Sequence, residues 1–200
     1  MIILTCEQRS DEWFEARKGR PTASAASKIL TSTGKRSTQR NAYLWELVAE
    51  RGGYGKPPFE PTEAMLEGIR REEEARNAYA FMTGTEPYEV GMIICPKTGA
   101  SASPDGLIGE GYGLEIKNPM GSTFFAEKYA GKVPANYLPQ IHMSMAVSGL
   151  DRWDYCCYLP GQDLIIHTVE RGELTEAFES ALADFCNELN ERTKEMLPDF

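Results

Sequence analysis

The stretch that most constrains the fold is residues 100–119, which reads ASASPDGLIGEGYGLEIKNP. Its segment Leu114–Asn118 lies between a glycine and a proline, and this punctuation predicts a short strand. Side chains alternate along a strand, so Glu115 and Lys117 should share one face of it. Asp105 follows a proline earlier in the same stretch. The pattern therefore predicts that two acids and a lysine converge on one point.

That convergence suits metal-dependent chemistry at a phosphate. A hard divalent cation such as Mg²⁺ takes one or two carboxylates and keeps waters and substrate phosphate oxygens in its other positions. A charged lysine cannot be a ligand, but it can hold or help deprotonate an attacking water and stabilise charge on the phosphate. The alternative is a hairpin whose polar side chains only face water. The spacing of the three residues does not decide between these two readings.

The exact residue order of this stretch is more specific than the spacing of its two acids and lysine. The segment SPDG followed by LEIKNP resembles the signature of the PD-(D/E)xK nuclease superfamily, and more narrowly that of the phage lambda exonuclease-like (YqaJ-type) viral recombinases. Three further blocks, WFEARKGRPTAS, GIRREEEAR and NYLPQIHMSMAV, continue the resemblance in the family's order. The four blocks span residues 13–147, and the chain after them adds little to the match.

This resemblance implies a fold and a function. The expected fold is α/β, with a central mixed β-sheet flanked by helices and a restriction-endonuclease-like core, in one nuclease domain over residues 1–200. The implied activity is a Mg²⁺-dependent 5′-to-3′ exonuclease on linear double-stranded DNA, leaving 3′ overhangs for phage-type recombination; Mn²⁺ is expected to substitute. Two alternatives stay open. One is another superfamily nuclease, an endonuclease or a junction resolvase, and the other is a non-catalytic module that binds DNA ends.

The resemblance also assigns roles to residues of the central stretch. Asp105 and Glu115 are expected to bind metal, the Ile116 carbonyl to complete the metal site, and Lys117 to orient the attacking water. Glu72 is expected to be a further ligand, directly or through water, in a two-metal hydrolysis scheme.

The periodicity of residues 62–83 points independently to Glu72. If these residues form one helix at about 100° per residue, Glu72 and Arg76 lie within its apolar stripe and Glu74 points away. An inward carboxylate needs a partner or a metal, and Arg76 is the alternative partner for Glu72. The apolar stripe consists of Met65, Ile69, Tyr79 and Met82.

A second set of residues suits recognition of a terminal phosphate. The resemblance implies that Arg17 and Ser24 line a pocket for the 5′-phosphate of DNA, and Ser103 would extend the pocket toward Asp105. An arginine can fork onto phosphate oxygens, and a serine at a helix start adds a hydroxyl beside free backbone N–H groups. The alternative for Arg17 is an ion pair on a partly buried helix.

The charge of the chain restricts how it can hold DNA. A net charge of −9 and a pI near 4.9 argue against binding by bulk electrostatics. They leave room for a locally basic cleft, expected to contain Lys28, Lys35, Arg36 and Arg40. Lys35 and Arg36 lie in a polar loop, which is expected either to contact the duplex or to be a solvated connection.

Composition narrows the class and location of the protein. No apolar run approaches the roughly 18 residues that span a bilayer, so a cytoplasmic protein without membrane association is expected. Five cysteines without a CxxC pair indicate neither a disulfide framework nor a zinc site, and all five are expected to be reduced. The resemblance further implies a homotrimeric ring around DNA and a single-strand annealing protein as partner.

The remaining elements follow from turn signals and periodicity. Gln140 lies on a helix expected over residues 136–147, where it could face the metals or be a buried structural glutamine. Other helices are expected over residues 11–18, from 24 onward, 40–51, 123–131 and 173–196. Strands are expected at 89–95, 100–103, 152–159 and 164–169, with a turn over 106–113.

Overall fold

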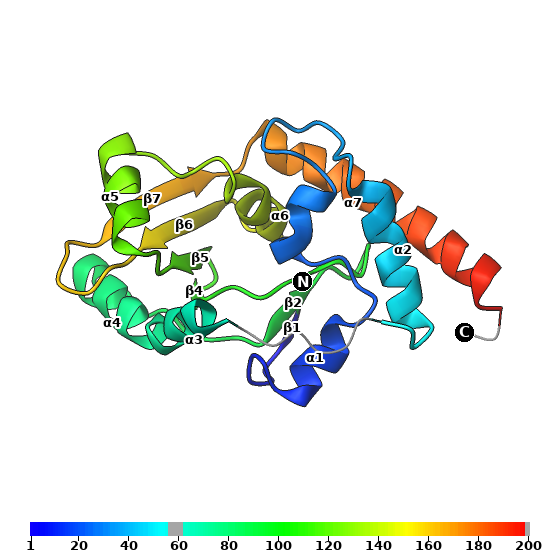
Figure 1. Ribbon diagram of the computed structural model, residues 1–200, viewed down its shortest axis with the longest axis horizontal. Coiled ribbons are helices and arrows are strands. Elements are labelled where there is room, and N and C mark those ends of the chain that lie inside the picture. The colour runs from blue at the N-terminus through cyan, green and yellow to red at the C-terminus, as the bar shows by residue number, and fades with distance from the viewer. Residues whose placement is uncertain (56–61, 199–200) are drawn as a thin grey trace.

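The computed structural model describes residues 1–55 and 62–198 (Figure 1). Its strands form two sheets, and the predicted α/β fold with a mixed β-sheet flanked by helices is confirmed. The first sheet is antiparallel, and its strands in order are β1 (Ile2–Leu4), β2 (Met92–Ile94) and β3 (Ser101–Ala102). The second contains β4 (Gly106–Ile108), β5 (Tyr112–Lys117), β6 (Arg152–Cys157) and β7 (Ile165–Glu170) in that order.

The second sheet is mixed because β5 and β6 run parallel while its other pairs are antiparallel. Parallel neighbours need a long crossover, which here contains α5 (Gly121–Ala130) and α6 (Leu138–Ser148). The expected hairpin between β6 and β7 is present. The crossover brings α6 back beside the strand that carries the acids.

Both faces of this sheet are covered (Figure 1). On one face, Tyr79 of α4 (Glu72–Thr83) packs against Leu114 and Ile116. On the other, Phe124 of α5 packs against buried side chains of β6. Ile116 thus faces α4, whereas Glu115 and Lys117 face α6, as the alternation predicted.

A separate core joins the first sheet to the remaining helices. It lies among η1 (Ala23–Lys28), α2 (Arg40–Arg51), α6 and α7 (Glu173–Met196), with α2 and α7 at the opposite end of the molecule from α4 and α5 (Figure 1). The short helix α1 (Asp11–Arg17) packs through Trp13 against β2. All five cysteines are free thiols, as expected. No helix in the described part of the chain is long and apolar enough to cross a membrane.

Several predicted elements need correction. The helix expected over 62–83 is two helices, α3 (Glu63–Arg70) and α4, which meet at Arg71. The three glutamates after Arg71 favour a helix start there because acidic side chains stabilise the positive end of the helix dipole. Of the predicted stripe, Tyr79 is buried, but Met65 and Met82 are 49% and 56% exposed.

Three smaller differences concern one helix start and two short strands. The helix expected to begin at Ser24 is a short 3₁₀ helix that begins at Ala23. The turn expected over 106–113 contains β4, because the segment pairs back onto β5. The N-terminal strand β1 carried no local signal strong enough to predict it.

Gly113 provides a test of the packing on β5. A Cβ at this position would lie 2.5 Å from three ring carbons of Trp153, which is fully buried. Gly113→Ala should therefore destabilise the protein by about 1–3 kcal/mol, the usual cost of overpacking a core. Gly111→Ala is the matched control, since its nearest neighbour would be 3.8 Å away. Urea unfolding should show the loss for the first variant only, and equal midpoints would contradict this packing.

Candidate active site

Asp105 is fixed against β5 by two hydrogen bonds. Its backbone N–H donates to the Leu114 carbonyl at 3.0 Å, and its carboxylate Oδ2 accepts from the Ile116 N–H at 2.6 Å. In an extended strand, the N–H and C=O of one residue point to the same side. The Ile116 carbonyl therefore points to the same side of β5 as Asp105.

The Glu115 side chain lies on the face of β5 that α6 covers, and it is only 2% exposed. Its Oε1 accepts a hydrogen bond from the Gln140 amide at 2.5 Å and another from the Lys117 ammonium. The Lys117 Nζ also lies 5.3 Å from the centre of the Tyr137 ring. Asp105, Glu115 and Lys117 are thus brought together as predicted. Of the two positions left open for Gln140, the structure shows the one in which its amide, from the first turn of α6, reaches Glu115.

The charged groups of this cluster shift one another's pKa values. Burial, followed by the neighbouring Glu115 carboxylate, raises the pKa of Asp105 to about 8, although Lys117 opposes the shift. Burial lowers the pKa of Lys117, but the carboxylates of Glu115 and Asp105 more than compensate and raise it overall. When both carboxylates are ionised, they outnumber the one lysine and the site carries a net negative charge. An additional cation would relieve the repulsion that holds up the Asp105 pKa.

The donor set fits a hard divalent cation. It comprises the two carboxylates and the Ile116 carbonyl, and Asp105 remains partly open to solvent. Oxygen ligands of this kind are those that Mg²⁺ accepts. Within the described residues, however, no three Asp, Glu, His or Cys side chains lie close enough together to hold a metal. Glu72 therefore does not join the other two acids in this arrangement.

Glu72 instead pairs with a residue that the sequence did not indicate. Both of its carboxylate oxygens accept hydrogen bonds from Nη2 of Arg9, at 2.6 and 2.8 Å. The alternative prediction, that Arg76 pairs with Glu72, is wrong. Arg76 donates to the Asp105 carbonyl at 2.9 Å and pairs with Glu89. Glu72 begins α4, and its charge still contributes to the raised pKa of Asp105.

The three residues predicted to bind a phosphate are linked through Trp13. The Trp13 indole N–H donates at 2.9 Å to the hydroxyl of Ser103 and at 2.9 Å to the Gly91 carbonyl. The Arg17 guanidinium lies over the Trp13 ring, 4.2 Å from its centre, and donates to the Ser24 hydroxyl at 3.2 Å. The Trp13 ring thus fixes both the arginine and one serine.

This arrangement leaves donors available to an anion. Because Ser103 accepts from the indole N–H, its own hydroxyl hydrogen is free to donate elsewhere. Ser24 is exposed, and Arg17 is half-buried with its charge on the Trp13 ring. A cation and two hydroxyls are suitable donors for phosphate oxygens. The spacing of Trp13 and Arg17 on α1 was visible in the sequence, but the bond to Ser103 was not.

Gln8 is a second residue that the sequence did not single out. Its side-chain amide donates to the carbonyls of Val90 at 2.9 Å and Pro104 at 2.8 Å. These bonds fasten the N-terminal loop to the segment between Ser103 and Asp105. No short-range pattern could have indicated them, because the partners lie 82 and 96 residues away.

The expected basic cleft is only partly present. Lys28 pairs with Glu46 at 2.8 Å, and Arg40 pairs with Glu188 at 2.6 Å, so two of its four charges are neutralised. Lys35 and Arg36 make no ion pair within residues 1–55 and 62–198. They remain the candidates for contact with DNA.

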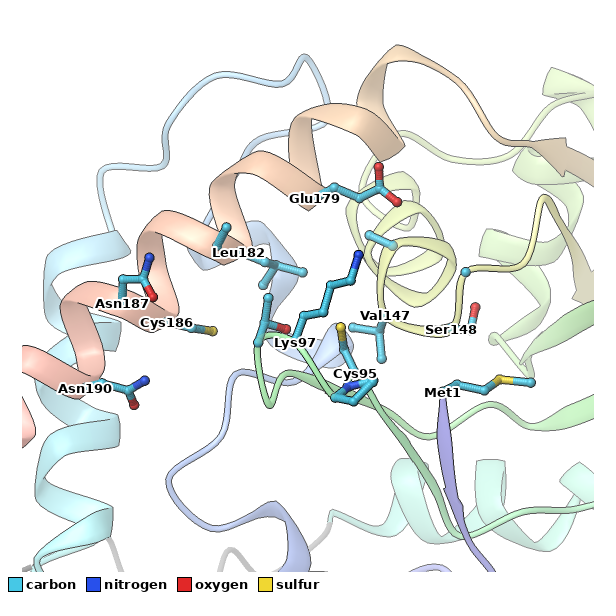
Figure 2. A pocket seen from close by; sticks show the side chains of 15 residues that line it. Met1, Cys95, Lys97, Val147, Ser148, Glu179, Leu182, Cys186, Asn187 and Asn190 are labelled. Carbon is cyan, nitrogen blue, oxygen red and sulfur yellow. The ribbon is translucent and has the colours of Figure 1, made fainter.

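A pocket of about 560 Å³ lies elsewhere, among the turn after β2, α6 and α7 (Figure 2). Figure 2 shows the Lys97 side chain extending from this turn toward Glu179 of α7, with Leu182 and Cys186 on the same helix. It contains none of the predicted site residues. The candidate site is therefore not this pocket but the surface around β5.

The comparisons with known proteins agree with the geometry. A family model described as the YqaJ-like viral recombinase domain matches residues 12–151. The crystal structure of an alkaline exonuclease (LHK-Exo) from Laribacter hongkongensis is 31% identical, with a TM-score of 0.82 over 95% of this chain and 97% of that one. Its complex with dAMP gives 30% identity, the same TM-score and the same coverage.

A phage related exonuclease from Haemophilus somnus 129PT shares the fold, with a TM-score of 0.61 and 15% identity. The similarity covers 86% of this chain and 96% of that one. Among curated proteins, none matches the chain.

The raised pKa of Asp105 predicts how a neutral variant affects stability. The folded pKa of about 8 exceeds the ordinary aspartate pKa of 3.8, so ionised Asp105 destabilises the fold increasingly from about pH 4 to pH 8. Asp105→Asn cannot ionise and can still accept from the Ile116 N–H. Because Asp105 keeps some solvent contact, the variant should gain about 1–3 kcal/mol at pH 8 and little at pH 4.

Urea unfolding at several pH values with a metal chelator measures this difference. Asp163→Asn is the control, because its carboxylate is 91% exposed and should show no pH-dependent gain. If the free energies of unfolding of Asp105→Asn and wild type differ by the same amount at every pH, or if the variant is less stable at pH 8, the Asp105 pKa is not raised in the folded protein.

Proposed function

The chain belongs to the YqaJ-like viral recombinase family, and we propose that it is a Mg²⁺-dependent exonuclease that degrades one strand of linear double-stranded DNA from its 5′ end, leaving 3′ overhangs. The similarity to an alkaline exonuclease supports a DNA exonuclease. The convergence of Asp105, Glu115, Lys117 and Gln140 beside β5 is the observation that carries the proposal.

Asp105, Glu115 and the Ile116 carbonyl would hold the cation, with Mn²⁺ as a substitute. When bound, the cation supplies charge that polarises the scissile phosphate and lowers the pKa of water. Gln140 keeps Glu115 oriented by donating to Oε1. Glu72 is proposed as an outer acid of the same site, acting through water.

Lys117 holds the attacking water in this proposal. Its raised pKa keeps it charged, so it serves as a hydrogen-bond donor and as a source of positive charge near the developing negative phosphate. The Glu115 carboxylate and the Tyr137 ring restrict the position of the ammonium. Because Lys117 is already protonated, the proton of the water would pass to an ionised carboxylate of the site, Glu115 or Asp105, or to solvent.

Arg17, Ser24 and Ser103 are proposed to bind the 5′-phosphate. Ser103 lies two residues before Asp105, so a phosphate held by Ser103 is adjacent to the acids. Lys35 and Arg36 would contact the duplex. This placement favours cutting from the 5′ end.

A homotrimeric ring is proposed to retain the DNA, with a single-strand annealing protein receiving the product strand. A ring would explain how a chain of net charge −9 stays on a polyanion, because retention by shape does not depend on bulk charge. A superfamily endonuclease or junction resolvase remains the alternative enzyme, and a circular duplex distinguishes it from an exonuclease. A non-catalytic module is disfavoured because every acid of the motif is present.

Loss of a catalytic group should abolish digestion without additive effects. Lys117→Ala, Asp105→Ala and the double variant should each lose most activity, on the order of 10³-fold or more, because the groups act as one unit. Single-turnover digestion of labelled linear duplex with Mg²⁺ measures this, and circular duplex should stay intact. Lys128→Ala, an exposed lysine on α5, is the matched control. Substantial activity in Lys117→Ala with unchanged DNA binding would contradict the assignment.

The phosphate pocket should make the enzyme prefer 5′-phosphorylated ends. Each charge-assisted bond is worth about 1.5–3 kcal/mol, so Arg17→Ala should erase most of the preference while leaving metal binding intact. Initial rates on duplexes with 5′-phosphate or 5′-hydroxyl ends, each strand labelled separately, give the comparison. Arg192→Ala removes a distant exposed arginine and serves as control. Equal wild-type rates on both ends, or earlier loss of the 3′ label, would refute the pocket and the direction.

A further inference from the structure

Arg9 has a backbone conformation that is unusual for its residue type. Its φ is +70°, and it is the non-glycine residue with positive φ in the described part of the chain. A side chain with a Cβ is disfavoured there, so such a conformation persists only when the surroundings fix it. The position would suit glycine, so an arginine here carries a conformational cost.

Hydrogen bonds of the residues on either side of Arg9 hold its backbone in this conformation. Gln8 is bonded to the carbonyls of Val90 and Pro104. Ser10 donates to the Glu7 carbonyl at 2.6 Å and accepts from the Trp13 N–H at the start of α1. The loop is therefore anchored on both sides of Arg9, and the arginine side chain extends from it toward α4.

The guanidinium meets Glu72 and occupies both oxygens of its carboxylate, at 2.6 and 2.8 Å. The two side chains are 39% and 20% exposed, so the pair is reachable by solvent and ions. Glu72 is close enough to Asp105 to affect its pKa, yet it is not part of any three-acid cluster in residues 1–55 and 62–198. The arginine thus engages an acid whose charge reaches Asp105 but which lies outside the Asp105–Glu115 pair.

We propose that Arg9 is a positioning residue that competes with a divalent cation for the Glu72 carboxylate. This inference rests on the proposed function, in which Asp105 and Glu115 bind the cation. A cation that draws on Glu72 must displace the guanidinium, so its apparent affinity equals its intrinsic affinity multiplied by the fraction of Glu72 that is unpaired. Arg9 thereby keeps Glu72 in an outer role and sets how tightly the site holds metal.

Arg9→Gly tests the proposal because glycine accepts a φ of +70° without strain. The variant should bind Mn²⁺ about 5- to 20-fold more tightly, the size expected when one charge-assisted pair no longer competes. Titration followed by electron paramagnetic resonance of free Mn²⁺ measures this without reference to activity. Asparagine also tolerates this conformation, so Arg9→Asn should bind Mn²⁺ as tightly as Arg9→Gly does. The Mn²⁺ affinity of Arg9→Lys should lie between those of Arg9→Gly and wild type.

Two controls separate competition from other effects. Arg192→Ala makes the same change of net charge on α7 and should leave Mn²⁺ affinity unchanged. In a Glu72→Gln background, Arg9→Gly should have no further effect, because the group for which it competes is gone. Thermal unfolding of metal-free Arg9→Gly should show one cooperative transition, so that its Mn²⁺ affinity reports on a folded site.

Unchanged Mn²⁺ affinity in Arg9→Gly, or the same tightening in the Glu72→Gln background, would overturn the proposal. The proposed function is tested separately by Asp105→Asn, which should weaken Mn²⁺ binding. If Asp105→Asn binds Mn²⁺ as wild type does, the metal site itself is wrongly assigned and this inference fails with it. If only the Arg9 effect is missing, the metal site stands and Glu72 is held apart for structural reasons.

Discussion

The structure of the site depends on the close approach of two carboxylates, Asp105 and Glu115, next to one strand. Bringing both out of water is unfavourable, and the raised pKa of Asp105 reflects that cost. The surrounding groups reduce it: the Ile116 N–H donates to Asp105, while Lys117 and Gln140 donate to Glu115. A cluster that is electrostatically unfavourable without further positive charge is a typical sign of a functional site.

The sheet topology makes this cluster possible. Because β5 and β6 are parallel, the chain between them must cross over, and the returning helix α6 places Gln140 and Tyr137 over the acidic face of β5. The opposite face of β5 is filled by Ile116 against α4. One strand therefore carries the core on one side and the chemistry on the other, so packing errors in β5 would displace both.

The parts that sequence could predict are those set by local periodicity. Strand alternation placed Glu115 and Lys117 opposite Ile116, and helix spacing brought Gln140 to the site. The break at Arg71 was missed because periodicity treats a charged run as the middle of a helix, although it also suits a helix start. Arg9 was missed because its importance comes from a partner 63 residues away, which no local pattern contains.

The proposed phosphate pocket and the acids are connected by a very short piece of chain. Ser103 and Asp105 are separated only by Pro104, whose carbonyl is held by Gln8 while Trp13 holds the Ser103 hydroxyl. Proline restricts the backbone further by fixing its own φ. In the proposed exonuclease, this restrained segment would hold a phosphate bound at Ser103 at a nearly constant distance from Asp105. That constraint would set the cut at a constant position from the 5′ end.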